Sequence, residues 1–177
     1  MITRAIEKSF ERARLKKWDR TFWAVDIHET IIRPNYDKPG IPIQWYPFAK
    51  EAMRIISNRK DVDLILYTCS WEHEIGEYLD MFKSEGIHFK YVNRNPDAAN
   101  TTYGCYDFKP YFNVLFEDKA GFDPIEWPYI IELLEYYPDG YGLMKDDEIN
   151  EHRSKLDTHR KIRKYGCKPN YRQNEQP

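Results

Sequence analysis

The sequence lacks most of the features that identify the common classes of protein. No apolar run is long enough to cross a membrane, and residues 1–20 are a charged segment without the apolar core of a signal peptide. We therefore expect a soluble protein with no membrane partner. Neither a glycine-rich phosphate loop of the P-loop type nor a G-x-G-x-x-G pattern is present, which argues against enzymes of nucleoside triphosphates and dinucleotides.

Cysteine is also scarce. The three cysteines, Cys69, Cys105 and Cys167, are an odd number, widely spaced and without a C-x-x-C pair. Such a set favours reduced thiols and a cytoplasmic location. Cys69 lies near His73 but is not followed by the C-x5-R loop of a thiol phosphatase, so we interpret it as an unreactive cysteine near a strand end.

Charge is nearly balanced overall but uneven along the chain. The formal net charge of the 177 residues is −2. Residues 150–177 carry eight Lys or Arg and three Asp or Glu, a difference of +5, which leaves −7 on residues 1–149. Such a basic segment can bind nucleic acid, or it can stay solvated or fold back on its own domain. The second interpretation is favoured, because short charge runs are weak signals.

The pattern of apolar residues predicts one α/β domain. With 41% hydrophobic and 16% aromatic residues, the chain can bury a substantial core. Strands and helices alternate, which indicates a three-layer, Rossmann-like parallel sheet with helices on both faces. We place this domain at residues 1–143 and a charged, basic helix with a polar tail at 144–177. The predicted helices lie at about 3–18, 47–58, 71–85, 128–137 and 144–164, and the predicted strands at 21–26, 61–68, 87–92 and 111–116.

Two segments carry no periodicity. Residues 33–47 contain four prolines and a glycine and predict a flap, and residues 93–108 predict a loop. Residues 31–61 are mostly flap and helix, and residues 71–108 are one helix, a strand and a loop, so neither stretch can hold a large cap domain. An open site suits a large substrate such as a nucleic-acid end or a phosphoprotein, or a cap from a second subunit, and small phosphate esters remain candidates.

Reactive side chains stand at the ends of three predicted strands. Asp26 ends the first strand, Thr68 ends the second, and Glu117 and Asp118 follow the fourth. Each has a common structural explanation, since such residues also form turns and cap helices. Ligands of open parallel sheets bind at the carboxyl ends of the strands. Because these side chains are all expected at that one edge, together they favour a binding site for phosphate and metal.

Phosphoryl transfer through a protein carboxylate needs a limited set of groups. One aspartate attacks phosphorus, a metal neutralises the phosphate, a hydroxyl and a cation hold the other oxygens, and a proton donor serves the leaving group. Asp26 supplies the attacking aspartate, and Thr68 supplies the hydroxyl. Lys109, in Phe-Lys-Pro, supplies a cation, and the acids of FEDKAGFD, which ends at Asp123, supply metal ligands.

This order resembles the four motifs of the haloacid dehalogenase superfamily over about residues 20–137. There an apolar strand precedes Asp-x-Asp-x-Thr/Val, a second strand ends in Thr or Ser, a lysine comes next, and a last strand leads into paired acids. Here the corresponding stretches are TFWAVDIHET, the strand ending at Thr68, FKP, and FNVLFEDKAGFDP. The stretch from Val92 to Asp123 is similar to the small phosphatase-like members without a cap.

The resemblance implies a Mg²⁺ cofactor and a role for each matching residue. Asp26 would be the nucleophile and a metal ligand, and Asp118 a second ligand. Glu117 or Asp123 would support the metal. The phosphate clamp would be formed by Thr68 and Lys109.

Two positions depart from the superfamily pattern. Glu117 replaces the first acid of the last motif, and His28 replaces the second aspartate of the first motif, where the superfamily has its general acid and base. An imidazole that titrates near pH 6.5 can donate and accept the same proton. The resemblance also implies that the main-chain carbonyl of His28 binds the metal, whatever its side chain.

The expected function is that of a hydrolase: a magnesium-dependent phosphomonoesterase that acts through an aspartyl-phosphate. The alternative is a weakly active or inactive relative that binds phosphate or nucleic acid. His28 and the basic tail favour the alternative, whereas the presence of Asp26, Thr68, Lys109 and Asp118 favours the enzyme.

Overall fold

The computed structural model describes residues 1–165 and, within them, the side chains of residues 1–160. The chain divides into two units, Met1–Met144 and Lys145–Pro177. In the second unit the structure describes one helix, α5, over Asp146–Tyr165. Residues 166–177 of the predicted polar tail lie outside the described residues. None of the helices described is both long and apolar enough to span a membrane.

The first unit is built on an open sheet of four parallel strands in the order β3-β2-β1-β4. This sheet confirms the predicted α/β, Rossmann-like fold. The strands are β1 Thr21–Val25, β2 Val62–Leu66, β3 Tyr91–Val92 and β4 Val114–Phe116. β3 and β4 start later than predicted. Ile87, the predicted start of β3, is buried but donates its N–H to Phe82 at the end of a helix, so its apolar character reflects burial and not strand pairing.

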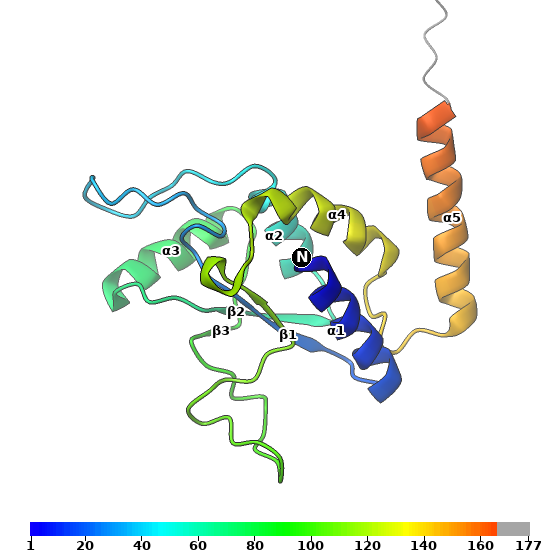
Figure 1. Cartoon of the computed structure of the whole chain (residues 1–177), viewed down its shortest axis with the longest axis horizontal. Helices are drawn as coiled ribbons and strands as arrows, with labels where there is room; N and C mark the ends of the chain where they lie inside the picture. Colours follow the sequence, from blue (N-terminus) through cyan, green and yellow to red (C-terminus); the bar gives the residue numbers. More distant parts are fainter. Residues whose placement is uncertain (166–177) are drawn as a thin grey trace, which may run out of the picture. The chain divides into compact units, whose positions relative to one another are not determined.

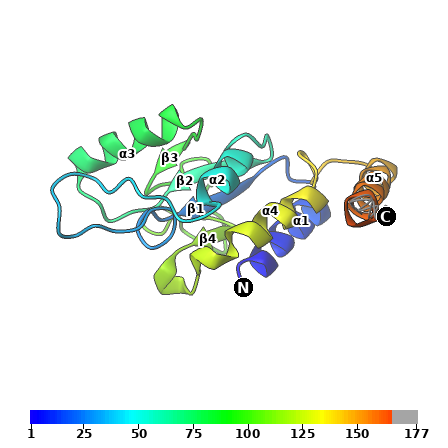
Figure 2. The same cartoon turned by 90° about the horizontal axis from the view of Figure 1, so that it is seen from above.

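Four helices form one outer layer of the first unit (Figures 1 and 2). They are α1 Thr3–Lys16, α2 Ala49–Ser57, α3 Glu72–Ser84 and α4 Trp127–Tyr136. Helix α4 packs against α1 and α2, and these two pack on the strands. Helix α3 lies beside α2, because Glu85 at its end pairs with Lys50 and Arg54 of α2.

The connection from β3 to β4, residues 93–113, lies on the opposite side of the sheet from the helices (Figure 1). Its rings contact the strands, with Phe22 against Tyr111 and Tyr67 against Phe112. Successive steps from β1 to β2 to β3 in one direction place α2 and α3 on one face, and the return to β4 crosses the other. This second layer is not helical, because the connection is rich in Asn and interrupted by Pro96 and Pro110.

Aromatic side chains link the helices to the strands. Phe116 of β4 stacks on Trp127 of α4 with ring centroids 5.4 Å apart, and Trp23 of β1 packs against both Phe116 and Phe10 of α1. The indole N–H of Trp127 donates to the carbonyl oxygen of Thr30 at 2.9 Å. Helix α4 is thereby tied to the loop after β1.

A buried ion pair fixes the segment after α4. The Arg59 and Asp61 side chains are 7% and 6% exposed, with 2.8 Å between Nε and Oδ1. Arg59 also donates to the carbonyl oxygen of Tyr137, and Oδ2 of Asp61 accepts from the N–H groups of Gly140 and Tyr141. Both charges therefore have partners in a site that water scarcely reaches.

We expect Asp61→Ala to destabilise the first unit by about 3–5 kcal/mol, because it leaves the buried Arg59 guanidinium without its carboxylate. Glu85→Ala, which removes a more exposed partner of Lys50 and Arg54, should cause a much smaller loss. Urea denaturation of the three proteins measures the difference. Equal losses in the two variants would show that the Arg59 pair contributes no more than a surface pair.

Candidate functional site

The strand order places a switch point between β1 and β4. From β1 the chain steps sideways to β2 and β3 and then returns to the other side of β1 for β4. Ligand sites of open α/β sheets lie at such a point, beyond the carboxyl ends of the strands. Asp26 directly follows β1, and Glu117 and Asp118 directly follow β4. The N–H of Asp26 donates to the carbonyl oxygen of Phe116 at 2.9 Å, so the two strand ends stay paired up to the acids.

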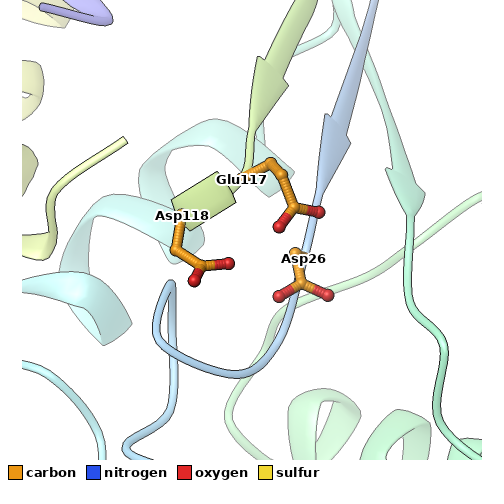
Figure 3. Close-up of side chains that lie close together, drawn as sticks. All are labelled: Asp26, Glu117 and Asp118. Carbon is orange, nitrogen blue, oxygen red and sulfur yellow. The ribbon is translucent and has the colours of Figure 1, made fainter. Parts of the chain in front are cut away.

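The three acids converge at this edge (Figure 3). One carboxylate oxygen from each of Asp26, Glu117 and Asp118 lies within 4.8 Å of the other two, and all three residues are half-buried. Oxygens that share a Mg²⁺ ion at about 2.1 Å are about 3–4 Å apart, so a small contraction would suffice for a shared ion. The donor set therefore fits a hard cation.

The cluster carries an excess of negative charge. The pKa of Asp26 is raised to about 6, chiefly by burial and also by the charges of Glu117 and Asp118, against the opposing effect of the Ile27 N–H. Burial also raises the pKa of Glu117. Lys119 offsets part of this charge, with its Nζ 3.4 Å from Oδ1 of Asp118, but its side chain is 84% exposed. A bound cation would relieve the repulsion.

Packing fixes the loop after Asp26. The N–H groups of Ile31 and Ile32 both donate to the carbonyl oxygen of Ile27, and all three isoleucines are fully buried. Glu29 adopts a left-handed backbone with φ of 54°, and its carboxylate accepts a hydrogen bond from the Tyr46 hydroxyl. The loop is thus fixed by its buried isoleucines, which pack in the core, and by the hydrogen bond from Tyr46 of the flap.

His28 is half-buried beside Asp26. Its Nε2 lies 2.7 Å from the hydroxyl of Tyr78, a residue of α3 that is only 1% exposed. Burial lowers the pKa of His28 and raises the pKa of Tyr78, so both groups favour their neutral forms. Because this contact occupies Nε2, Nδ1 is the ring nitrogen left for a ligand.

Thr68 lies two residues beyond β2 on the same edge. Its N–H donates to the side-chain oxygen of Asn93 at 2.8 Å, and Asn93 returns a hydrogen bond to its carbonyl oxygen at 2.7 Å. The Thr68 hydroxyl donates to the hydroxyl of Ser70 at 3.1 Å. These contacts fix the backbone of Thr68, and its hydroxyl also accepts a hydrogen bond from the N–H of Ser70 at 3.2 Å.

An open cleft of about 830 Å³ joins these groups. Asp26, His28, Thr68 and Glu117 line it, together with part of the 33–47 flap. The lining also includes two lysines that were not among the predicted site residues, Lys38 of the flap and Lys119. Lys119 could have been found, because it directly follows Asp118, whereas nothing in the flap sequence marks Lys38.

Two predicted site residues lie apart from the cluster. Lys109 is exposed on the 93–113 connection and does not line the cleft. That connection reaches β4 from the amino edge of the sheet, where Asn113 bonds to Phe22, and it carries Lys109 away from the carboxyl edge. Asp123 caps the short helix η2, Pro124–Glu126, by accepting the N–H of Ile125 at 3.0 Å.

We expect Asp26→Asn to stabilise the protein in metal-free buffer at about pH 8 by about 1–2 kcal/mol. The raised pKa means that folding favours protonated Asp26. The stability that protonated Asp26 contributes is fully present below the ordinary Asp pKa of 3.8, and it is lost as the pH rises through the raised pKa of about 6. The gain should therefore vanish near pH 4.

Urea denaturation with a chelator at the two pH values measures this difference. Asp37→Asn, at an exposed position of the flap, is the matched control and should show no gain at either pH. A gain for Asp26→Asn that is the same at both pH values would contradict repulsion within the cluster.

Comparison with known proteins identifies the fold and no family. No family model and no curated protein matches the chain. A solved structure, described as a conserved protein coded by a locus of Bacteroides thetaiotaomicron, is similar with a TM-score of 0.52 and 20% sequence identity. The similarity covers 72% of this chain and 99% of the other. At this level of identity the likeness extends to the fold alone.

Proposed function

We propose that this protein is a magnesium-dependent phosphomonoesterase that acts through an aspartyl-phosphate. The observation that carries the proposal is the convergence of Asp26, Glu117 and Asp118 within 4.8 Å at the switch point of the sheet. Thr68 and Lys119 line the same cleft and can bind phosphate oxygens. A carboxylate cluster, a hydroxyl and an ammonium group are the groups that phosphoryl transfer to an aspartate requires.

Each side chain has a place in the reaction. Magnesium held by Asp26, Glu117 and Asp118 would neutralise charge on the phosphate, which otherwise repels the attacking carboxylate. Attack by Asp26 on phosphorus forms the aspartyl-phosphate and breaks the ester bond, and the leaving oxygen takes a proton from protonated His28 and departs as the alcohol. Neutral His28 then accepts a proton from water, and the hydroxide releases phosphate and restores Asp26.

The environment of His28 suits the second step better than the first. Burial lowers its pKa, which favours the neutral ring that accepts a proton, whereas the charges of Glu74 and Glu29 act in the opposite direction. This balance supports a second candidate function, a module that binds phosphate esters and turns them over weakly or not at all. A nucleic-acid role for the basic segment 150–177 remains part of that candidate.

Asp26→Asn is expected to abolish hydrolysis of a generic aryl phosphate in the presence of magnesium. The amide is nearly isosteric but cannot attack phosphorus. Asp123→Asn should keep most of the activity, because Asp123 caps η2 outside the cluster. Release of inorganic phosphate measures both variants, with circular dichroism as the folding control. Full activity of Asp26→Asn would place the nucleophile elsewhere.

The two lysines give a second test. Lys119→Ala should raise KM for the ester about 10-fold or more, because it removes a charge that lines the cleft. Lys109→Ala should leave KM unchanged, because Lys109 does not line the cleft. The opposite order in steady-state kinetics would indicate that the 93–113 connection approaches the site in solution.

Substitutions of His28 separate the two candidate functions. His28→Ala should lower the rate by about 10²-fold if this residue transfers the proton, and His28→Asp should keep or raise activity and move the pH profile towards acid. The measurement is the pH–rate profile of the three proteins with magnesium. If all three are equally inactive on every ester tried, the non-catalytic module is the better description.

A further inference from the structure

Two large aromatic side chains stand almost fully in solvent at the cleft that contains Asp26. Tyr36 is 83% exposed and Trp71 is 74% exposed, and both line this cleft. Tyr36 belongs to the 33–47 flap, and Trp71 is the residue that precedes α3. Figure 1 shows the flap, in blue to cyan, running out on the same side of the molecule as α3. Exposed apolar surface gathered at one cavity is a feature of ligand-binding grooves.

The cleft is graded from its acidic floor to its aromatic rim. Asp26 and Glu117 are half-buried at the carboxyl edge of the sheet, whereas the two rings are exposed. Hydroxyl groups of Thr68 and Ser70 also line the cleft. A ligand that fills it therefore meets half-buried carboxylates and hydroxyl-bearing residues as well as two exposed aromatic rings.

We propose that the phosphate ester bound here is a nucleotide, with its base against Tyr36 and Trp71 and its phosphate at the acidic floor. This inference rests on the proposed function, because it assumes that phosphate binds beside Asp26. Every base offers a planar face on which aromatic side chains stack. A cleft of about 830 Å³ is large enough for such a small molecule.

The separation of floor and rim distinguishes a nucleotide from a simple aryl ester. In an aryl phosphate the ring is bonded to the ester oxygen, so it would lie at the floor among charged groups. In a nucleotide the sugar separates the ring from the phosphate, and its hydroxyls can bond to Ser70. Lys38, which also lines the cleft on the flap, adds a positive charge for an anionic ligand.

The same chemistry is present in a free nucleotide and in the phosphorylated end of a nucleic-acid strand. Both carry a phosphate monoester, a sugar and a base in the same order. The two sources differ only beyond the first nucleotide, where the strand continues, so a longer ligand distinguishes them.

The test measures binding in the full-length Asp26→Asn protein with magnesium, which removes turnover as a complication. The probes are adenosine 5′-monophosphate and ribose 5-phosphate, which has the same phosphate and sugar but no base. We expect the nucleotide to bind about 10-fold more tightly or better, as stacking on aromatic side chains provides. Calorimetry gives both dissociation constants.

Replacing the two aromatic residues then tests whether they cause the tighter binding of the nucleotide. Tyr36→Ala and Trp71→Ala, each combined with Asp26→Asn, should reduce the nucleotide preference several-fold. Tyr103→Ala is the matched control, because Tyr103 is 99% exposed and does not line this cleft. It should leave the preference unchanged. Equal binding of the two probes, or a preference that survives both rim substitutions, would overturn the inference, as would tighter binding of phenyl phosphate than of the nucleotide.

Two further arms complete the experiment. A 5′-phosphorylated oligonucleotide that binds more tightly than the mononucleotide identifies a strand end as the source, and equal or weaker binding identifies the free nucleotide. Hydrolysis by the wild-type protein is scored separately. Nucleotide preference without hydrolysis supports this inference and contradicts the phosphatase, whereas hydrolysis without base preference supports the phosphatase and contradicts this inference.

Discussion

The hydrogen bond from the Asp26 N–H to the carbonyl oxygen of Phe116 continues the ladder between β1 and β4 beyond the paired residues of the two strands. Parallel pairing brings both carboxyl ends to the same edge, and in each strand an acid is the next residue. The short distance between Asp26 and the two acids Glu117 and Asp118 is therefore a consequence of strand register. A slip of one residue would turn one side chain to the other face of the sheet and break the cluster.

This proximity is unfavourable for the isolated chain. Three carboxylates within 4.8 Å repel one another, and burial raises the pKa of Asp26 to about 6. Repulsion among the ionised carboxylates opposes this arrangement, so the surrounding packing has to hold the two strand ends in place. Stacking of Phe116 on Trp127 and the hydrogen bond from Trp127 to Thr30 link β4, α4 and the loop after β1. A protein that keeps such a cluster gains affinity for a cation from the same repulsion.

The sequence predicts the floor of the site better than its walls. Asp26, Thr68, Glu117 and Asp118 are predictable because an apolar strand precedes each of them and parallel strands share an edge. Lys109 could not be placed in this way, because the connection that carries it has no periodicity and covers a face of the sheet. For the same reason the sequence did not reveal that residues 93–113 contain no helix. The pattern of alternating strands and helices does not show when one connection between strands lacks its helix.

The difference between floor and walls also bears on the division of work in the cleft. The floor is set by strand register and a buried aromatic core, so the phosphate and the metal would meet groups whose positions vary little. The rim comes from the flap and from the residue before α3, where Tyr36 and Trp71 have few packing partners. Substitutions there cost little stability, because those side chains are already in solvent. A fixed floor with an exposed rim is the arrangement in which the reacting group stays constant and the rest of the ligand is selected by loops.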